Sequence, residues 1–252
     1  MTGSGNWTWL IRGRVPTLVD AGVGNPQHLA ELEAALDGVP LAQVIVTHSH
    51  PDHAAGVAAI AARMPSARFL KMPWADHDNR WGVTWKSLAD GEHVDVGEAS
   101  AIVVHTPGHA PDHVCMWQPA TRTLFGGDLV IAGTTVWIPA SLGGDLAAYL
   151  VSLERVIALE PGRILPGHGP IITEPVPLLR KYVVHRRERE LQVIDALRDG
   201  AATPSAIVAR IYPALDQALV GRAEETVVAH LVKLEREGIT GRSAEAWHII
   251  DA

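Results

Sequence analysis

The chain has 252 residues, a formal net charge of −7 and a sequence pI near 6.0. That length allows one large α/β domain, or a domain of about 150–200 residues with a small appendage. The hydrophobic content of 47% is enough for a sizeable core. The net negative charge and the absence of a lysine/arginine-rich run argue against strong non-specific binding to polyanions. A local basic patch stays an open alternative.

Three features of the sequence bear on the compartment. The single cysteine, Cys115, excludes an intrachain disulfide framework and fits a reducing compartment. Residues 1–7 lack the charged and apolar regions of a secretory signal. No stretch approaches the roughly 18 consecutive apolar residues of a transmembrane helix. We therefore expect a cytoplasmic protein that does not associate with a membrane.

The N-terminal part of the chain alternates between predicted strands and helices. Strands are expected over residues 7–11, 17–20, 41–47 and 68–72, and helices over residues 26–36 and 54–63. Residues 73–93 follow no clear period and predict a long surface loop. Its three tryptophans, Trp74, Trp81 and Trp85, either form an aromatic wall for a substrate or pack against the sheet.

The alternation continues to about residue 172 and then gives way to helices. Strands are expected over residues 101–106, 113–118, 123–126 and 163–165, with a helix after Asp145. Further helices are expected over residues 178–198, from Thr203-Pro204 onward and over residues 223–237, before a hairpin at 239–250. The first pattern predicts helices packed over buried sheets. The second predicts a winged-helix-like appendage, so we place a catalytic domain at residues 1–175 and the appendage at residues 176–252.

A dense group of histidines follows directly on the 41–47 strand. The chain holds 13 histidines, roughly twice ordinary usage, and this segment reads Thr47-His48-Ser49-His50-Pro51-Asp52-His53. Pro51 and the helix behind it supply the sharp turn that lets these side chains converge. Neutral imidazoles suit zinc, iron or manganese, and a neighbouring carboxylate can bind a second ion. A histidine-rich surface loop is the weaker alternative, because this pattern is rare by chance at a strand–helix junction.

Three further candidates stand where other strands end. His109, Asp128 and His168 each follow an apolar strand at a glycine-containing turn. Such strand ends are where α/β folds place their sites. Taken singly, each is better explained as a capping or core polar group than as a metal ligand. Together with His48, His50, Asp52 and His53 they form a set of seven at one edge of the fold.

The ordered set H-x-H-x-D-H, then His, Asp and His, resembles the metallo-β-lactamase superfamily over about residues 6–172. The resemblance implies an α/β fold of the αβ/βα sandwich type, with two sheets face to face and helices outside. It also implies two metal ions, usually zinc and in some members iron or manganese. By this resemblance His48, His50 and His109 hold the first metal, Asp52, His53 and His168 hold the second, and Asp128 bridges both.

Asp128 also narrows the activity that the resemblance implies. β-Lactamases proper lack the bridging aspartate, whereas thioesterases of the glyoxalase II type and phosphodiesterases keep it. We therefore expect a metal-dependent hydrolase that is not a true β-lactamase. Its nucleophile would be a hydroxide shared by the two metals, and Asp52, which would bind a metal and orient that hydroxide, is the catalytic candidate.

A closer resemblance extends past the ligand set. It rests on Asn6 to Leu10, Gly126-Gly127-Asp128, His168-Gly169-Pro170 and Tyr182 to Arg189, and it is to the β-lactamase-like protein 2 group. Members of that group carry a C-terminal winged-helix-like appendage, and they include endoribonucleases. Acyl-carrier-protein thioesterases of fungal polyketide pathways are similar to the same group. Residues usually found before the first strand are absent here, so the start is either trimmed or lacks an edge strand.

Four more residues are candidates for supporting or substrate contacts. Asp20, Thr47 and His113 either fix imidazole tautomers or make ordinary capping and core hydrogen bonds. His185 lies among arginines at positions 186, 187 and 189, and it either contacts an anionic substrate or belongs to a solvated basic face.

The leading prediction is a dinuclear zinc hydrolase that cleaves an ester or thioester of a small substrate. Two alternatives stay open: an endoribonuclease or phosphodiesterase acting on single-stranded RNA, and a nucleic-acid-binding regulator that uses the winged-helix part. The third appendage helix carries more glutamates than a recognition helix that faces phosphates normally does. We expect the appendage to be a structural flank or a substrate-limiting lid. The sequence leaves the oligomeric state open, a homodimer included.

Overall fold

The computed structural model describes residues 5–244 and 246–250. Residues 1–4, on which part of the expectation of no secretory signal rests, lie outside the described residues, as does Glu245 of the predicted hairpin. Within the described ranges no helix combines the length and the apolar character that crossing a membrane requires.

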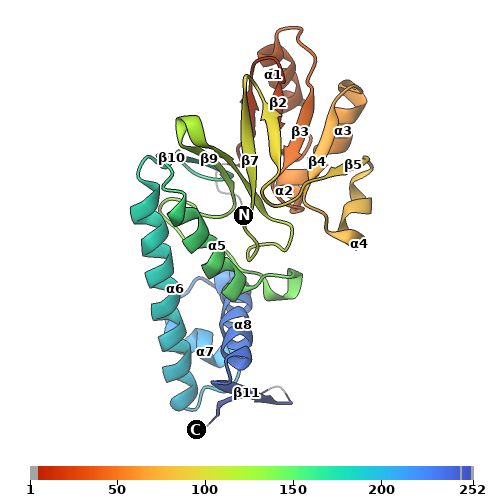
Figure 1. Ribbon diagram of the computed structural model, residues 1–252. Helices are drawn as coiled ribbons and strands as arrows, with labels where there is room; N and C mark the ends of the chain where they lie inside the picture. Colours follow the sequence, from red (N-terminus) through yellow and green to blue (C-terminus); the bar gives the residue numbers. More distant parts are fainter. Residues whose placement is uncertain (1–4, 245, 251–252) are drawn as a thin grey trace.

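Two five-stranded sheets form the centre of the fold (Figure 1). The first sheet contains, in spatial order, β1 (Trp9–Ile11), β2 (Thr17–Val19), β3 (Gln43–Val46), β4 (Arg68–Lys71) and β5 (Trp85–Ser87). The second contains β10 (Arg163–Pro166), β9 (Thr123–Gly127), β8 (Val114–Gln118), β7 (Ala99–His105) and β6 (His93–Val96). The strands from β2 to β5 run parallel, as do β9 and β10, and the other pairs are antiparallel. Apolar side chains from both sheets, such as Ile45 and Val103, share one buried cluster between them.

Helices cover the outer face of each sheet. Against the first sheet, α1 (Pro26–Leu36) and α3 (Val57–Arg63) bury Leu32 and Ile60 with Val44 of β3. Against the second, α5 (Leu146–Ala158) and the first half of α6 (Pro175–Arg198) bury Tyr149 and Leu179 with Ile164 of β10. This arrangement confirms the predicted αβ/βα sandwich.

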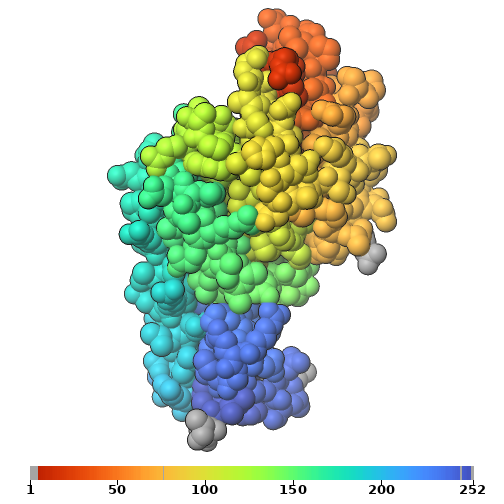
Figure 2. All heavy atoms as spheres, in the orientation of Figure 1, coloured from red at the N-terminus to blue at the C-terminus, as the bar shows by residue number. Residues whose placement is uncertain are grey.

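The C-terminal part has a hydrophobic core of its own. The second half of α6 packs with α7 (Pro204–Ile211), α8 (Val220–Arg236) and the hairpin of β11 (Thr240–Ser243) and β12 (Ala246–Ile249). Thr203 caps α7 as predicted, because its hydroxyl accepts from the Ala206 N–H. Three helices and a hairpin confirm the winged-helix-like appendage, which lies directly against the catalytic part (Figure 2). The division at residues 175/176 stays a prediction, since α6 begins at Pro175 and joins both cores.

Several predicted boundaries were wrong. The helix expected over residues 54–63 begins earlier, as α2 (Pro51–Ala54), and α3 starts only after Gly56. The helix expected from residue 178 begins at Pro175. In both cases proline occupies the first helical position, where its missing N–H costs nothing. The segment 73–93 is not a plain loop, since it holds α4 (Ala75–Asp78), a 3₁₀ turn and β5, and Trp81 and Trp85 pack against the core beside the first sheet.

Candidate metal centre

The seven predicted ligands come together at one edge of the sandwich. His48 and His50 follow β3, Asp52 and His53 lie in α2, and the others follow β7, β9 and β10. Their nitrogen and oxygen atoms form three groups, each within 4.8 Å: His48, His50 and His109; His48, His53 and Asp128; and Asp52, His53 and His168.

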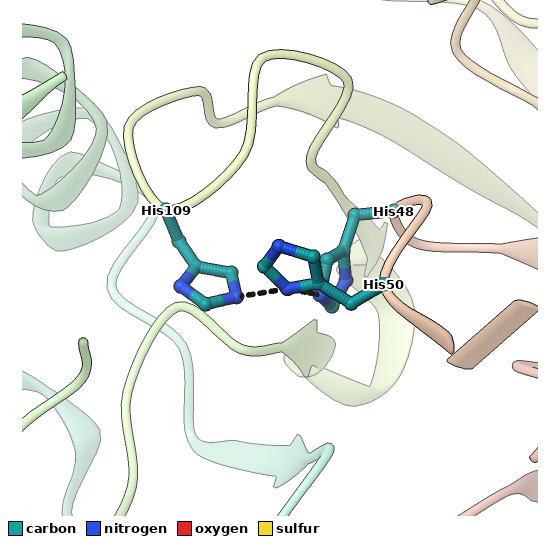
Figure 3. A group of neighbouring side chains, drawn as sticks. All are labelled: His48, His50 and His109. Atoms are coloured by element: carbon teal, nitrogen blue, oxygen red, sulfur yellow. Dashed lines mark hydrogen bonds between the residues drawn. The ribbon is translucent and has the colours of Figure 1, made fainter. Parts of the chain in front are cut away.

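The first group consists of three imidazoles aimed at one point (Figure 3). His50 Nδ1 lies 3.0 Å from His48 Nε2 and 2.8 Å from His109 Nε2. His109 Nδ1 must carry its proton, because it donates to the Trp137 carbonyl at 2.7 Å. Its Nε2 therefore presents a lone pair to the group.

The Thr47 hydroxyl sets the tautomer of His48. The Thr47 hydroxyl donates to Asp20 Oδ2 at 3.1 Å, so it accepts from His48 Nδ1–H, also at 3.1 Å. Two ring nitrogens with free lone pairs thus face His50 Nδ1. Such an arrangement is repulsive unless a proton or a cation lies between them.

The remaining four residues, Asp52, His53, Asp128 and His168, form the second group, which combines imidazoles with carboxylates. Asp128 Oδ1 lies 3.3 Å from His53 Nε2 and 3.4 Å from His168 Nε2, and Asp52 Oδ2 lies 3.2 Å from His168 Nε2. Asp128 Oδ2 lies 3.6 Å from His109 Nε2, in the first group. The two oxygens of this one carboxylate therefore face different groups.

Neighbouring acceptors orient the imidazoles of the second group as well. His53 Nδ1 donates to Asp20 Oδ2 at 2.7 Å, and His168 Nδ1 donates to the Gly5 carbonyl at 2.9 Å. Asp20 adopts a left-handed backbone conformation with φ of 63°, which aspartate tolerates better than most residues. Its Oδ1 also accepts from the Thr47 N–H at 2.7 Å. Both imidazoles consequently turn Nε2 toward the carboxylates.

The electrostatics differ between the two groups. Burial lowers the pKa of His48 well below its ordinary value and that of His50 to about 3, so both rings are neutral. Burial also disfavours charge on His53 and His168, but neighbouring carboxylates reverse this effect. The pKa of His53 lies well above its ordinary range, and that of His168 is raised to about 10. Burial raises the pKa of Asp128, but His53 and His168 bring it well below its usual value.

These donors fit metal ions. Imidazole nitrogens and carboxylate oxygens are the ligands that zinc, iron and manganese take. His53 Nε2 and Asp128 Oδ1 are buried without a hydrogen-bond partner among the described residues. Buried polar atoms of this kind need a partner. The negative field that raises the pKa of His53 and His168 also favours a cation beside them.

Three of the four predicted supporting residues, Asp20, Thr47 and His113, contact the predicted ligands. Asp20 and Thr47 contact the centre as described, and His113 Nε2 accepts from the Asp128 N–H at 3.0 Å. Its Nδ1–H donates to Thr106 Oγ1 at 2.8 Å, and burial lowers its pKa to about 3, which keeps it neutral. His185 lies half-buried on α6, and in the described part of the chain no hydrogen bond or ion pair joins it to the seven residues. Its role stays a prediction.

Some groups that orient the predicted ligands could not be recognised in the sequence. The Gly5 and Trp137 groups are backbone carbonyls, which every residue has, so no residue type indicates them. Behind the His48–His50 segment, the Ser49 hydroxyl donates to Asp112 Oδ2 at 2.7 Å. The same oxygen lies 3.1 Å from the buried Lys71 Nζ. Arg186, which follows His185 in the predicted basic cluster, is buried at 2% exposure and donates to the Val136 carbonyl.

Comparisons with known proteins agree with this geometry. The family described as "Metallo-beta-lactamase superfamily" matches residues 1–168, and the "Beta-lactamase associated winged helix domain" matches residues 203–247. The Beta-lactamase-like protein 2 homolog of Drosophila melanogaster is 32% identical, over 94% of this chain and 85% of that protein.

Two solved structures share the fold. A metallo-beta-lactamase family protein from Thermus thermophilus superposes with a TM-score of 0.80 at 21% identity, over 97% of this chain and 94% of that one. TTHA1623, solved in a di-iron-bound form, has a TM-score of 0.57 at 29% identity, over 68% of this chain and 91% of that one. The chain therefore belongs to the metallo-beta-lactamase superfamily of metal-dependent hydrolases and carries the winged helix domain associated with it.

Proposed function

We propose that this protein is a dinuclear metal hydrolase that cleaves an ester or thioester of a small substrate. The observation that carries the proposal is the position of Asp128, whose Oδ1 faces His53 and His168 while Oδ2 faces His109. A carboxylate in that position can bridge two ions. Zinc is the proposed metal, with iron or manganese as alternatives, and the di-iron form of the related TTHA1623 supports a centre of two ions.

Each residue of the centre has a proposed part. His48, His50 and His109 would hold one ion, Asp52, His53 and His168 the other, and Asp128 both. Bound divalent ions supply an acidified water as nucleophile and stabilise negative charge on the substrate. The protein's own contribution is to fix the ring orientations through the acceptors Asp20, Thr47, Trp137 and Gly5.

Asp52 is the proposed catalytic carboxylate. Its side chain is 25% exposed, against 12% for Asp128, so it is the carboxylate of the centre more open to substrate and solvent. Burial raises the pKa of Asp52, but the hydrogen bond with His168 and the charge of His53 bring it below its ordinary value. The carboxylate is therefore ionised at neutral pH and can accept a proton from the attacking water.

The choice of substrate class follows from the ligand set and the overall charge. A bridging aspartate is the feature that separates thioesterases and phosphodiesterases of this fold from β-lactamases, so antibiotic hydrolysis is not proposed. The formal charge of −7 disfavours long polyanions. A small ester or thioester fits both constraints.

An endoribonuclease acting on single-stranded RNA is the second candidate. It is favoured by Arg222 of α8, whose guanidinium lies over the Trp137 ring at 5.4 Å from its centroid. Trp137 is also the residue whose carbonyl orients His109. A guanidinium can pair with a phosphate and an indole ring can stack on a base, so this pair suits a nucleic acid strand.

The test is a comparison of substrates on the zinc-loaded protein. Aryl esters, pantetheine thioesters, a chromogenic cephalosporin and a fluorescent single-stranded RNA are offered in parallel, with the His48→Ala/His50→Ala variant as control. The proposal predicts thioester or ester turnover that the variant loses. RNA cleavage that the variant loses would favour the second candidate, and cephalosporin turnover alone would contradict the proposed substrate class.

A further inference from the structure

The N-terminal segment Gly5–Trp9 contacts the residues of the second group from two sides. On one side, Asn6 Nδ2 donates to the backbone carbonyl of Asp52 at 2.5 Å. Asp52 lies in the short helix α2, which has only four residues. This contact ties the start of α2 to a segment that is 46 positions away in the sequence.

On the other side, the segment holds the turn that carries His168. The Trp7 N–H donates to the Gly167 carbonyl at 2.7 Å, and the Trp7 indole N–H donates to the Gly169 carbonyl at 2.6 Å. The Trp9 indole N–H donates to the Pro166 carbonyl at 3.1 Å. Every residue of the turn from Pro166 to Gly169 except His168 itself thus accepts from Trp7 or Trp9.

His168 completes the set through its own side chain. Its Nδ1–H donates to the Gly5 carbonyl at 2.9 Å, which leaves Nε2 facing Asp52 and Asp128. The same segment therefore fixes the ring of His168, the backbone on both sides of it, and the backbone of Asp52. Its contacts with the centre fall on the second group, whereas the acceptors that orient His48 and His109 are Thr47 and Trp137.

We infer that Gly5–Trp9 is a positioning element for one of the two metal sites, the site of Asp52, His53 and His168, and that Asn6 and Trp7 are its positioning residues. The inference rests on the two-metal centre proposed above. Neither side chain reaches a ligand atom directly. Each acts by holding a backbone segment from which a ligand projects, and precise placement of ligands depends on such outer contacts.

Zinc titration of the metal-free, full-length protein by calorimetry tests this inference. The variants are Asn6→Ala, which removes the contact with Asp52, and Trp7→Phe, which removes the indole N–H but keeps an aromatic ring. Thr8→Val is the matched control, because the Thr8 hydroxyl pairs with His28 Nε2 at 2.8 Å and not with the centre. Cobalt absorption spectra of the same proteins report the coordination of each site, and thermal unfolding of the metal-free forms reports the fold.

We expect Asn6→Ala and Trp7→Phe to weaken only the binding step that the cobalt spectra assign to the site of Asp52, His53 and His168, about 10- to 100-fold, the usual effect of losing an outer contact of a metal ligand. The other step, the unfolding temperature of the metal-free protein and both steps of Thr8→Val should match the wild type. Equal weakening of both steps, no weakening, or the same loss in Thr8→Val would overturn the inference. A wild type that takes up only one ion would overturn the two-metal centre itself, so the two failures are distinguishable.

Discussion

Gly167 is a residue at which a single methyl group would disturb the centre. A Cβ atom there would lie 2.5 Å from Asp128 Oδ1 and 2.7 Å from His53 Cε1. Gly167→Ala must therefore displace the Asp128 carboxylate or the His53 imidazole. We expect zinc affinity and turnover to fall about 10- to 100-fold, as for lost outer contacts of metal ligands.

The control for this change is Gly221→Ala. Among the described residues, no atom outside the neighbouring backbone of α8 lies within 4 Å of a Cβ at Gly221, and alanine is favourable at a helical position. Calorimetric zinc titration measures the zinc affinity of both variants, and initial rates measure their turnover. Gly167→Ala behaving like Gly221→Ala would show that the turn does not press on the centre.

Lys71 stabilises the fold from beneath the His48–His50 segment. Its side chain is 1% exposed, and Nζ lies 2.5 Å from Asp78 Oδ1 and 3.1 Å from Asp112 Oδ2. Lys71→Met removes the charge that compensates the buried Asp112 carboxylate. Breaking a buried pair in this way costs about 3–5 kcal/mol of unfolding free energy.

Lys86→Met provides the comparison in denaturant unfolding. Lys86 is 54% exposed and pairs with Glu92 at 3.2 Å, and an exposed pair contributes only about 0–1 kcal/mol. Similar small losses in both variants would contradict the structural role of Lys71.

The residue types of the centre could be predicted from the sequence, but the contacts that orient them could not. His48 to His53 carry their chemistry in a short, dense pattern. Lys71 and Asp112, in contrast, are common surface residue types that lie far apart in the sequence, and only the folded chain brings them together. Asn6 was recognised as part of a resemblance, while its hydrogen bond with Asp52 depends on the path of the chain.

At the level of elements, α6 braces the segment that carries Asp128. The Tyr182 hydroxyl accepts from the Ile131 N–H at 3.1 Å and lies 2.7 Å from the Thr134 carbonyl. Arg186, one turn further along α6, donates to the Val136 carbonyl. Next to Val136 is Trp137, whose carbonyl orients His109. The helix α6 thus supports the segment from Asp128 to Trp137, which contains one predicted ligand and the carbonyl that orients another.

A pH-sensitive pair lies where α8 meets α6. His230 is fully buried, and its Nδ1 lies 3.8 Å from Glu190 Oε2. The other charged residues around this pair are Arg186 and Arg189 of α6 and Lys233 of α8. Burial lowers the pKa of His230 from 6.5 to about 4, although the contact with Glu190 opposes the change. Between about pH 6.5 and about pH 4, His230 is therefore protonated in the unfolded chain and neutral in the folded chain.

The free energy of unfolding that depends on neutral His230 should therefore decrease as the pH falls from 6.5 toward 4. We expect the stability difference between wild type and His230→Phe, both metal-free, to shift against the wild type between about pH 7.5 and about pH 5. Urea unfolding at the two pH values measures it. A difference that does not change with pH would mean that His230 titrates normally in the folded protein.

Element types were easier to predict than element boundaries. The strand pattern and the apolar stripe of α5 indicated the two layers correctly, because side-chain periodicity reports which face is buried. The starts of α2 and α6 were missed because proline was interpreted as a break, whereas it occupies the first helical position. The strand β5 was missed because its three residues follow a segment without a period.

Over the whole molecule, α8 packs against the catalytic part. Glu225 accepts from the Ser141 N–H at 2.8 Å, and Arg236 pairs with Asp145, the cap of α5. Two charged side chains of α8, Glu225 and Arg236, therefore bind to the catalytic part. These contacts support the appendage as a structural flank rather than as a DNA-reading module.

Asp128 is the residue on which the proposed centre of two metal ions depends most directly. The most direct measurement is the number of zinc ions bound per chain, by native mass spectrometry, in the wild type and in Asp128→Ala. We expect two ions in the wild type and a loss of the paired state in the variant, because the Asp128 carboxylate faces both groups of ligands. A wild type that saturates with one ion, or a variant that still binds a pair, would contradict the proposed centre.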